Sequence, residues 1–270
     1  MRIKLIAFAA APLAAVIVLA GLSAPTGKVS PMTTPKVSGR SAATYFTILR
    51  NDVYSGWSVN PPGGVTKEVA AVWHVPKVAC TWQRSRAAVW VGIWGQNNSK
   101  NPWLAQTGTI SACFGHVASY RAFIELVPSG PEVQSIKVNR GDDIFASVTY
   151  KGRVVAGKDK GKLEFVYTLD DSTDYPAGLV SVTRYTNAGV QVKDAAWQGG
   201  AIVEREPGGG LAKFTPPITI HAGVNGWPPD HFSGRGLFRW DMVNSGGKKF
   251  ATTGAVNVNG DFSVTWIRSS

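Results

Sequence analysis

Apolar and polar residues alternate in short runs along most of the chain after about residue 45. In residues 68–75, for example, every second position is apolar, and the run ends at Pro76. Residues 261–266 repeat this pattern near the C-terminus. Because successive side chains of a β-strand point to opposite faces, the alternation predicts strands with one buried face. Residues 87–93 are apolar throughout, which predicts a central strand that is buried on both faces.

Four further runs predict strands in the middle of the chain, and turns rich in glycine, proline and aspartate separate them. These runs are residues 120–127, 144–150, 163–169 and 179–185. We find no convincing amphipathic helix after the N-terminal segment and no internal repeat. The pattern predicts an all-β fold, an antiparallel sandwich or barrel, formed by a single domain over residues 45–270.

The first 24 residues have the pattern of a secretory signal peptide. Arg2 and Lys4 form a short basic region, residues 5–20 are apolar, and small residues follow. An uncleaved membrane anchor is the alternative, although the run is short for a span of about 20 residues. Residues 25–44 are rich in Pro, Thr, Ser, Gly and Lys and predict a linker or short pro-segment. We expect a secreted protein, extracellular or periplasmic, that leaves the membrane after signal cleavage.

Composition and charge narrow the class of protein. Hydrophobic residues make up 44% of the chain and charged residues 17%, which supplies a core and excludes a disordered acidic segment. The net charge is +11, yet basic residues are scattered singly apart from two clusters at expected hairpin turns, residues 158–162 and 247–249. The chain has no recognisable nucleic-acid module. We therefore expect a basic, solvated surface, no nucleic-acid partner and a monomer.

The two cysteines, Cys80 and Cys113, are too few for a four-cysteine zinc site. In an exported protein they predict a disulfide, and two separate buried thiols are the alternative. Familiar catalytic patterns are also missing: the sequence contains no G-x-S-x-G, no H-E-x-x-H and no phosphate-binding loop. The four histidines are far apart in sequence, so we expect no metal and no cofactor.

Two polar residues interrupt apolar strand faces. Gln106 shares a face with Leu104, and Glu204 shares a face with Ile202. An amide and a carboxylate on apolar faces fit a binding site on a concave sheet. The spacing alone fits ordinary structural roles better than it fits a binding site. In these roles Glu204 forms an ion pair at a strand end and Gln106 caps a turn.

Five segments, however, follow one another in the order and spacing of a known family. They are residues 55–76, residues 90–108 with W-V-G-I-W-G and L-A-Q-T-G, residues 120–128 with Y-R-A-F-I-E-L-V-P, residues 141–144 with G-D-D-I, and residues 201–214 with A-I-V-E. They resemble the eqolisins, the glutamic endopeptidases, whose motifs include W-V-G-I-D-G, L-Q-T-G, Y-x-A-W-Y-E-W-Y-P and G-D-x-I. Each motif alone is weak, and the resemblance rests on all five together.

The resemblance implies a fold and a reaction. The fold would be a sandwich of two curved antiparallel sheets, of the concanavalin A-like or jelly-roll type. The reaction would be the hydrolysis of peptide bonds in protein or peptide substrates, at acidic pH and without metal or cofactor. Gln106 and Glu204 would be the catalytic dyad. Glu204 would take a proton from a water held between the two side chains, and the Gln106 amide would stabilise the oxyanion.

Further residues are placed in the substrate cleft by their positions in these motifs. They are Trp57, Trp94, Tyr120, Phe123 and Glu125. A purely structural role fits Phe123 and Tyr120 equally well. Trp94 stands where the family has aspartate, and the chain is basic whereas characterised fungal members are acidic, so the acidic pH optimum follows less directly than the dyad.

Two other classes of function remain open from the sequence. A curved sandwich with exposed tryptophans also suits a carbohydrate-binding module. A glycoside hydrolase could use Glu204 and Glu125 as its pair of carboxylates.

Overall fold

The computed structural model describes residues 46–61, 64–81, 84–95, 103–174, 178–187, 197–206, 209–225, 236–257 and 259–269. The expected signal peptide and the expected linker or pro-segment lie outside these residues. No helix within the described ranges is long and apolar enough to cross a membrane.

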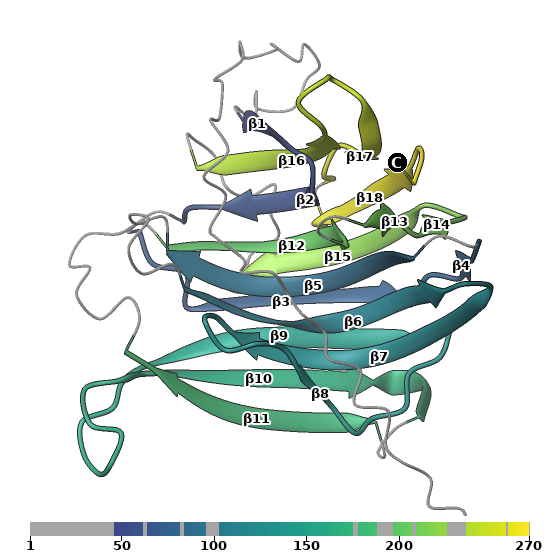
Figure 1. Cartoon of the computed structure of the whole chain (residues 1–270). Coiled ribbons are helices and arrows are strands. Elements are labelled where there is room, and N and C mark those ends of the chain that lie inside the picture. The colour runs from purple at the N-terminus through teal and green to yellow at the C-terminus, as the bar shows by residue number, and fades with distance from the viewer. Residues whose placement is uncertain are drawn as a thin grey trace, which may run out of the picture.

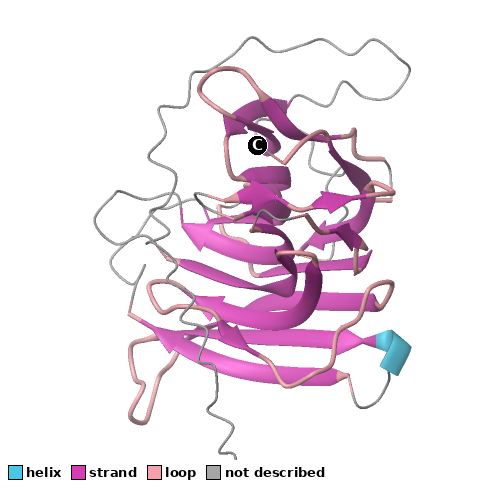
Figure 2. Cartoon of the chain, turned by 45° about the vertical axis from the view of Figure 1, so that its right-hand side comes forward, coloured by secondary structure: helices cyan, strands magenta, loops and turns pink. Residues whose placement is uncertain are grey.

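Nearly all regular structure in the described residues is β-strand, with one short 3₁₀ helix, η1 (Figure 2). The elements are β1 (Phe46–Asn51), β2 (Tyr54–Val59), β3 (Glu68–His74), β4 (Val78–Ala79), β5 (Ser85–Gly95), β6 (Leu104–Phe114), β7 (Val117–Leu126), β8 (Glu132–Val133), β9 (Asp143–Arg153), β10 (Leu163–Asp171), η1 (Ser172–Asp174), β11 (Leu179–Thr186), β12 (Trp197–Arg205), β13 (Gly210–Leu211), β14 (Lys213–Phe214), β15 (Ile218–Val224), β16 (Leu237–Val243), β17 (Lys249–Thr253) and β18 (Asp261–Trp266). Every run that the sequence pattern singled out coincides with a strand, and the runs 68–75 and 120–127 extend one residue past the ends of β3 and β7.

The strands form two layers that one hydrogen-bonded path connects. The first layer has the order β11-β10-β9-β3-β15-β18, and the second has the order β16-β2-β12-β5-β6-β7-β8. Strand β17 pairs with both β18 and β16 and so links the layers along one edge. Strands β5 and β6 of the second layer contact β9 and β10 of the first. Figure 1 shows the stack, with β10 and β11 at the bottom and β16 and β17 at the top.

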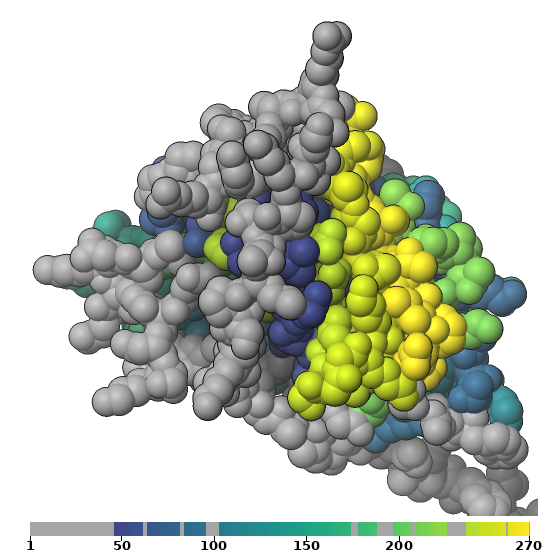
Figure 3. Space-filling model, turned by 90° about the horizontal axis from the view of Figure 1, so that it is seen from above, coloured from purple at the N-terminus to yellow at the C-terminus, as the bar shows by residue number. Residues whose placement is uncertain are grey.

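Most pairs in this path are antiparallel, and the all-β sandwich predicted from sequence is confirmed. Strand β1 is an exception, because it pairs in parallel with β16. The beginning of the described chain therefore lies against its C-terminal part. In Figure 3 the purple N-terminal strands contact the yellow-green C-terminal ones.

The main hydrophobic core lies between the layers. Its largest fully buried side chains include Trp73, Phe165 and Tyr167. Strand β10 shows how the alternation builds this core, since its odd-numbered residues are buried and its even-numbered residues are partly exposed. Cys80 and Cys113 are joined in a disulfide, with their Cα atoms 5.3 Å apart, which confirms the predicted pairing.

Candidate active site

The second layer has two different faces. One face packs into the main core, and the other carries a separate apolar cluster that is rich in aromatic rings. We call this second side the aromatic face; its buried apolar members are Leu49, Ala88, Trp90, Phe123, Ile202 and Trp240. A strand in this layer must satisfy an apolar environment on both sides, which explains why residues 87–93 lack polar side chains.

Several buried polar side chains lie on the aromatic face, among them Arg86, Gln106, Glu125 and Glu204. Gln106, Glu125 and Glu204 have relative exposures of 1%, 5% and 4%. Burying a polar or charged side chain costs free energy unless it has a partner, so the partners of these groups decide what each can do.

The strand register places Gln106 directly beside Glu125. The two residues are paired across β6 and β7, so their side chains leave the sheet on the same face. Gln106 Nε2 donates a hydrogen bond to Glu125 Oε2 at 2.5 Å. At the other end of the same amide, Gln106 Oε1 is buried and has no hydrogen-bond partner among the described residues. The amide is therefore satisfied at its donor end only.

The environment shifts the pKa of Glu125 strongly. Burial raises this pKa from 4.5 to about 7, and the hydrogen bond from Gln106 acts in the opposite direction. The charge of Glu204 raises the pKa further, and the charge of Arg86 lowers it. Glu125 is therefore a carboxylic acid in mildly acidic solution and a carboxylate only above about pH 7.

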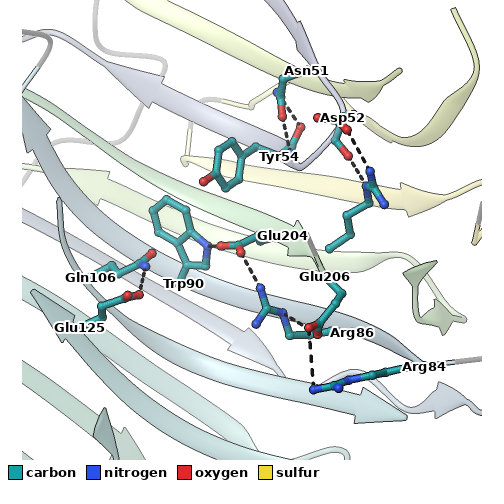
Figure 4. Close-up of polar contacts among 11 residues, drawn as sticks. Asn51, Asp52, Tyr54, Arg84, Arg86, Trp90, Gln106, Glu125, Glu204 and Glu206 are labelled. Atoms are coloured by element: carbon teal, nitrogen blue, oxygen red, sulfur yellow. Dashed lines mark hydrogen bonds and ion pairs between the residues drawn. The ribbon is translucent and has the colours of Figure 1, made fainter. Parts of the chain in front are cut away.

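Glu204 has entirely different partners (Figure 4). Arg86 Nη2 donates to Glu204 Oε1 at 2.7 Å, and Trp90 Nε1 donates to Glu204 Oε2 at 2.9 Å. Burial is the largest influence on Glu204 and raises its pKa, while Arg86 and Trp90 act against that rise. Arg86 Nε also lies 3.7 Å from Glu206 Oε2, so the guanidinium of Arg86 lies between two carboxyl groups, those of Glu204 and Glu206.

The structure does not bring Gln106 and Glu204 into contact. Gln106 lies in register with Gly92 of β5, whereas Glu204 lies in register with Ala88 of the same strand. The two α-carbons are therefore two strands apart, roughly 10 Å, and four residues apart along the strands, roughly 13 Å. In Figure 4 the indole of Trp90 lies between Glu204 and the Gln106–Glu125 pair.

The five expected cleft residues divide between the two faces. Trp94, Phe123 and Glu125 lie on the aromatic face with Gln106. Trp57 and Tyr120 lie on the opposite side and pack against the main core. Trp57 Nε1 donates to the backbone oxygen of Gly254 at 3.0 Å, which accounts for its polar atom inside the core. Odd and even positions of a strand face opposite ways, and this periodicity separates the two groups.

Sequence reasoning did not identify Arg86 and Trp90 as partners of Glu204. Each is more than a hundred residues from Glu204 along the chain, so only the strand register brings them together. One signal was available for Arg86: it directly precedes the apolar run 87–93, and a charge inside a strand buried on both sides requires a counter-charge.

Taken together, the aromatic face holds an amide, a carboxyl that is protonated below about pH 7, and a second carboxyl that accepts hydrogen bonds from Arg86 and Trp90. Such groups can donate hydrogen bonds to a developing oxyanion and can exchange protons with water. The described ranges contain no group of three His, Cys, Asp or Glu side chains that could hold a metal ion.

Comparisons with known proteins bear on the fold of this chain and on the sequence of one part of it. No curated protein matches the sequence. The fold is similar to the crystal structure of scytalido-glutamic peptidase with a transition state analog inhibitor, with a TM-score of 0.59 and 17% identity over 80% of this chain and 98% of that chain. Aspergilloglutamic peptidase from Aspergillus niger matches with a TM-score of 0.42 and 24% identity over 67% of this chain and 99% of that chain.

The sequence comparison with protein families is more specific than the likeness in fold. Residues 52–160 match the Peptidase A4 family. This stretch contains W-V-G-I-W-G, L-A-Q-T-G and Y-R-A-F-I-E-L-V-P, three of the motifs that carry the resemblance seen in the sequence. Over residues 52–160 the chain is therefore similar to the Peptidase A4 (eqolisin) family of glutamic peptidases.

Proposed function

We propose that this chain is a secreted endopeptidase that hydrolyses peptide bonds on its aromatic face, at acidic pH, with Gln106 and Glu204 as the catalytic pair. The observation that carries the proposal is the presence of both side chains, buried, on this one face of the sheet. The Peptidase A4 family supplies the substrate class, which is protein or peptide.

In this mechanism Glu204 is the general base. It takes a proton from a water molecule while the water oxygen attacks the scissile carbonyl carbon. The carbonyl becomes an oxyanion, and the Gln106 amide N–H donates a hydrogen bond to it. Glu204 then gives its proton to the departing amine as the C–N bond breaks. Arg86 and Trp90 would hold the carboxylate in place throughout.

The α-carbons of Gln106 and Glu204 lie on opposite sides of β5, so their side chains would act from two sides of one peptide bond. The Gln106 amide would contact the carbonyl oxygen and the Glu204 carboxylate the attacking water, each at hydrogen-bond distance. A substrate chain would lie across β5 between Gln106 and Glu204, against the indole of Trp90. The requirement is that both side chains reach the same peptide bond, and direct contact between them is not needed.

The direct test is peptide release from denatured casein by the purified protein between pH 2 and pH 8. We expect release that increases toward acid pH and that persists with chelators and with serine and cysteine reagents. The Gln106→Ala and Glu204→Gln variants should each abolish most of it. A folded protein that releases no peptide at any pH would overturn the proposal. Cleavage of an oligosaccharide panel instead would favour the glycoside hydrolase alternative.

Secretion is part of the same proposal. We propose that residues 1–24 are a signal peptide that is removed and that residues 25–44 connect it to the sandwich domain. The Cys80–Cys113 disulfide supports an oxidising destination. N-terminal sequencing of the protein recovered from outside the cytoplasm should begin after about residue 24. Recovery of exported protein that still carries Met1 would contradict the cleavage.

A further inference from the structure

We propose that the protonation state of Glu125 sets the orientation of the Gln106 amide. As a carboxylic acid, Glu125 donates a hydrogen bond to Gln106 Oε1, and Nε2 then points toward the substrate. As a carboxylate, Glu125 accepts a hydrogen bond from Nε2, which is then not available to the substrate. This inference rests on the proposed function and deepens it. Glu125 is a positioning residue in this scheme, because it acts through Gln106 and does not touch the substrate.

The hydrogen-bond pattern of the amide carries the argument. Gln106 Nε2 donates to Glu125 Oε2, while Gln106 Oε1 is buried without a partner. A buried amide that is satisfied at one end has a second arrangement available, because its oxygen and its NH₂ group are nearly the same size. A half turn about the last side-chain bond exchanges them without displacing a neighbour.

The two arrangements differ in what Gln106 presents away from Glu125. In the arrangement of this structure the atom that points away from Glu125 is Oε1, an acceptor, which would repel a developing oxyanion. In the turned arrangement Nε2 takes that place and can donate. Only a protonated Glu125 stabilises the turned arrangement, because a carboxylate has no proton to give to Oε1.

The groups around Glu125 set the pH at which its carboxyl loses its proton, and this pH is near neutral. Burial raises the pKa of Glu125 to about 7, Glu204 on β12 raises it further, and Arg86 on β5 opposes them. Two tyrosines also feel its charge, Tyr54 on β2 and Tyr167 on β10 of the other layer. Burial raises the pKa of both phenols, so both stay uncharged around pH 7.

The sign of the pH dependence follows directly. Below about pH 7 Glu125 is protonated and the amide can present Nε2 to the substrate. As the pH rises through that value, Glu125 ionises and holds Nε2, and the oxyanion loses its donor. Peptidase activity should therefore fall about tenfold for each pH unit above the pKa, because the protonated fraction falls by that factor.

The test is the pH profile of kcat/KM for the Glu125→Gln variant between pH 4 and pH 9. A glutamine at position 125 can always donate an N–H to Gln106 Oε1, and it does not titrate in this range. We expect the alkaline fall of the parent protein to disappear, so that at pH 9, two pH units above the pKa, the variant is about a hundredfold more active than the parent. Glu132→Gln is the matched control; Glu132 is exposed and paired with Arg184, so its variant should keep the parent profile.

Two outcomes would overturn the inference. One is an unchanged alkaline fall in Glu125→Gln. The other is a folded Glu125→Gln protein that is inactive at acid pH, because Glu125 would then transfer the proton itself. Failure of the proposed function looks different: the parent protein would show no peptide release that depends on Gln106 and Glu204.

A second measurement decides the matter if Glu125→Gln does not fold. The side-chain NH₂ resonances of Gln106 in the parent protein, followed by NMR from pH 5 to pH 9, should shift with a midpoint near pH 7, because the amide turns as Glu125 ionises. Resonances that stay constant over this range would overturn the inference.

Discussion

Glu125 and Glu204 are two buried glutamates on one face of one sheet, and they differ in their partners. Glu125 faces an uncharged amide, whereas Glu204 faces the guanidinium of Arg86 and the indole N–H of Trp90. Burial raises the pKa of both carboxyls, but a cation in contact opposes that rise only for Glu204.

This difference shows that the chemistry of a buried carboxyl depends on its neighbours more than on its position in a motif. An ion pair favours a carboxylate, which suits a group that must accept a proton from water. An amide can pair with either state of a carboxyl by presenting its NH₂ group or its oxygen, which suits a group that controls orientation. Each of the following experiments changes one of the two glutamates or one of their partners.

The largest effect is expected for Glu204→Gln. The substitution preserves the shape of the side chain and removes the base, so kcat should fall by about 10²–10⁴-fold on denatured casein. Glu206→Gln is the matched control, because Glu206 also lies near Arg86 but has a partly exposed side chain. A well-folded Glu204→Gln protein that retains more than about a tenth of the parent activity would exclude Glu204 as the base.

Removal of the counter-charge should have the next largest effect. Arg86→Met leaves Glu204 buried with only the Trp90 hydrogen bond, and a buried charge that loses its partner typically costs about 3–5 kcal/mol of stability. The cost should be largest at alkaline pH and smaller at pH 4, where Glu204 can be protonated. Urea unfolding at both pH values measures it.

A double variant checks that this loss comes from Glu204. In Arg86→Met combined with Glu204→Gln no buried charge remains, so the double variant should be more stable at pH 8 than Arg86→Met alone. Strictly additive losses would show that the Arg86 side chain contributes by packing alone.

The fold could be predicted from sequence because the signal is local. Alternation over six to eight residues is enough to identify strands such as β3 and β10, and the apolar run identifies β5 as buried on both sides. The disulfide followed from the export signal and the count of two cysteines. None of these inferences needs to know which strands are neighbours.

The partners in the site could be predicted only where the turn is short. Gln106 and Glu125 lie on consecutive strands joined by a two-residue turn at Gly115 and His116, which fixes their pairing. Arg86 and Glu204 are 118 residues apart, and their pairing depends on β12 returning beside β5. The side chains of Trp57 and Gln106 point to opposite faces of the second layer, and this too depends on the register between strands.

The oxyanion donor is tested by Gln106→Ala. Loss of one such donor typically lowers kcat by about 10²–10³-fold, while the fold should survive because the substitution leaves the strand intact. The variant also removes the hydrogen bond that opposes the pKa rise of Glu125, so that pKa should rise further. Gln134→Ala is a suitable control, since Gln134 donates to the Glu132 backbone in an exposed position. An effect on kcat below about fivefold would remove Gln106 from the reaction.

The smallest expected effect is on stability, and it isolates Glu125. In the unfolded chain its carboxyl has a pKa of 4.5, and in the folded protein the pKa is about 7. Between these values the folded state retains a proton that the unfolded state has lost. Stability due to Glu125 is therefore fully present below about pH 4.5, falls as the pH rises, and levels off above about pH 7, with a total change of about 3 kcal/mol.

Glu125→Gln should abolish this slope, because its amide does not titrate in this range. Every other titrating group, including Glu204, is common to the variant and the parent, so the difference between their urea midpoints at pH 4.5, 6 and 8 reports on Glu125 alone. We expect the variant to gain on the parent steadily across this range. A constant difference from pH 4.5 to pH 8 would mean that Glu125 ionises at the same pH in both states, and the contrast with Glu204 would then rest on geometry only.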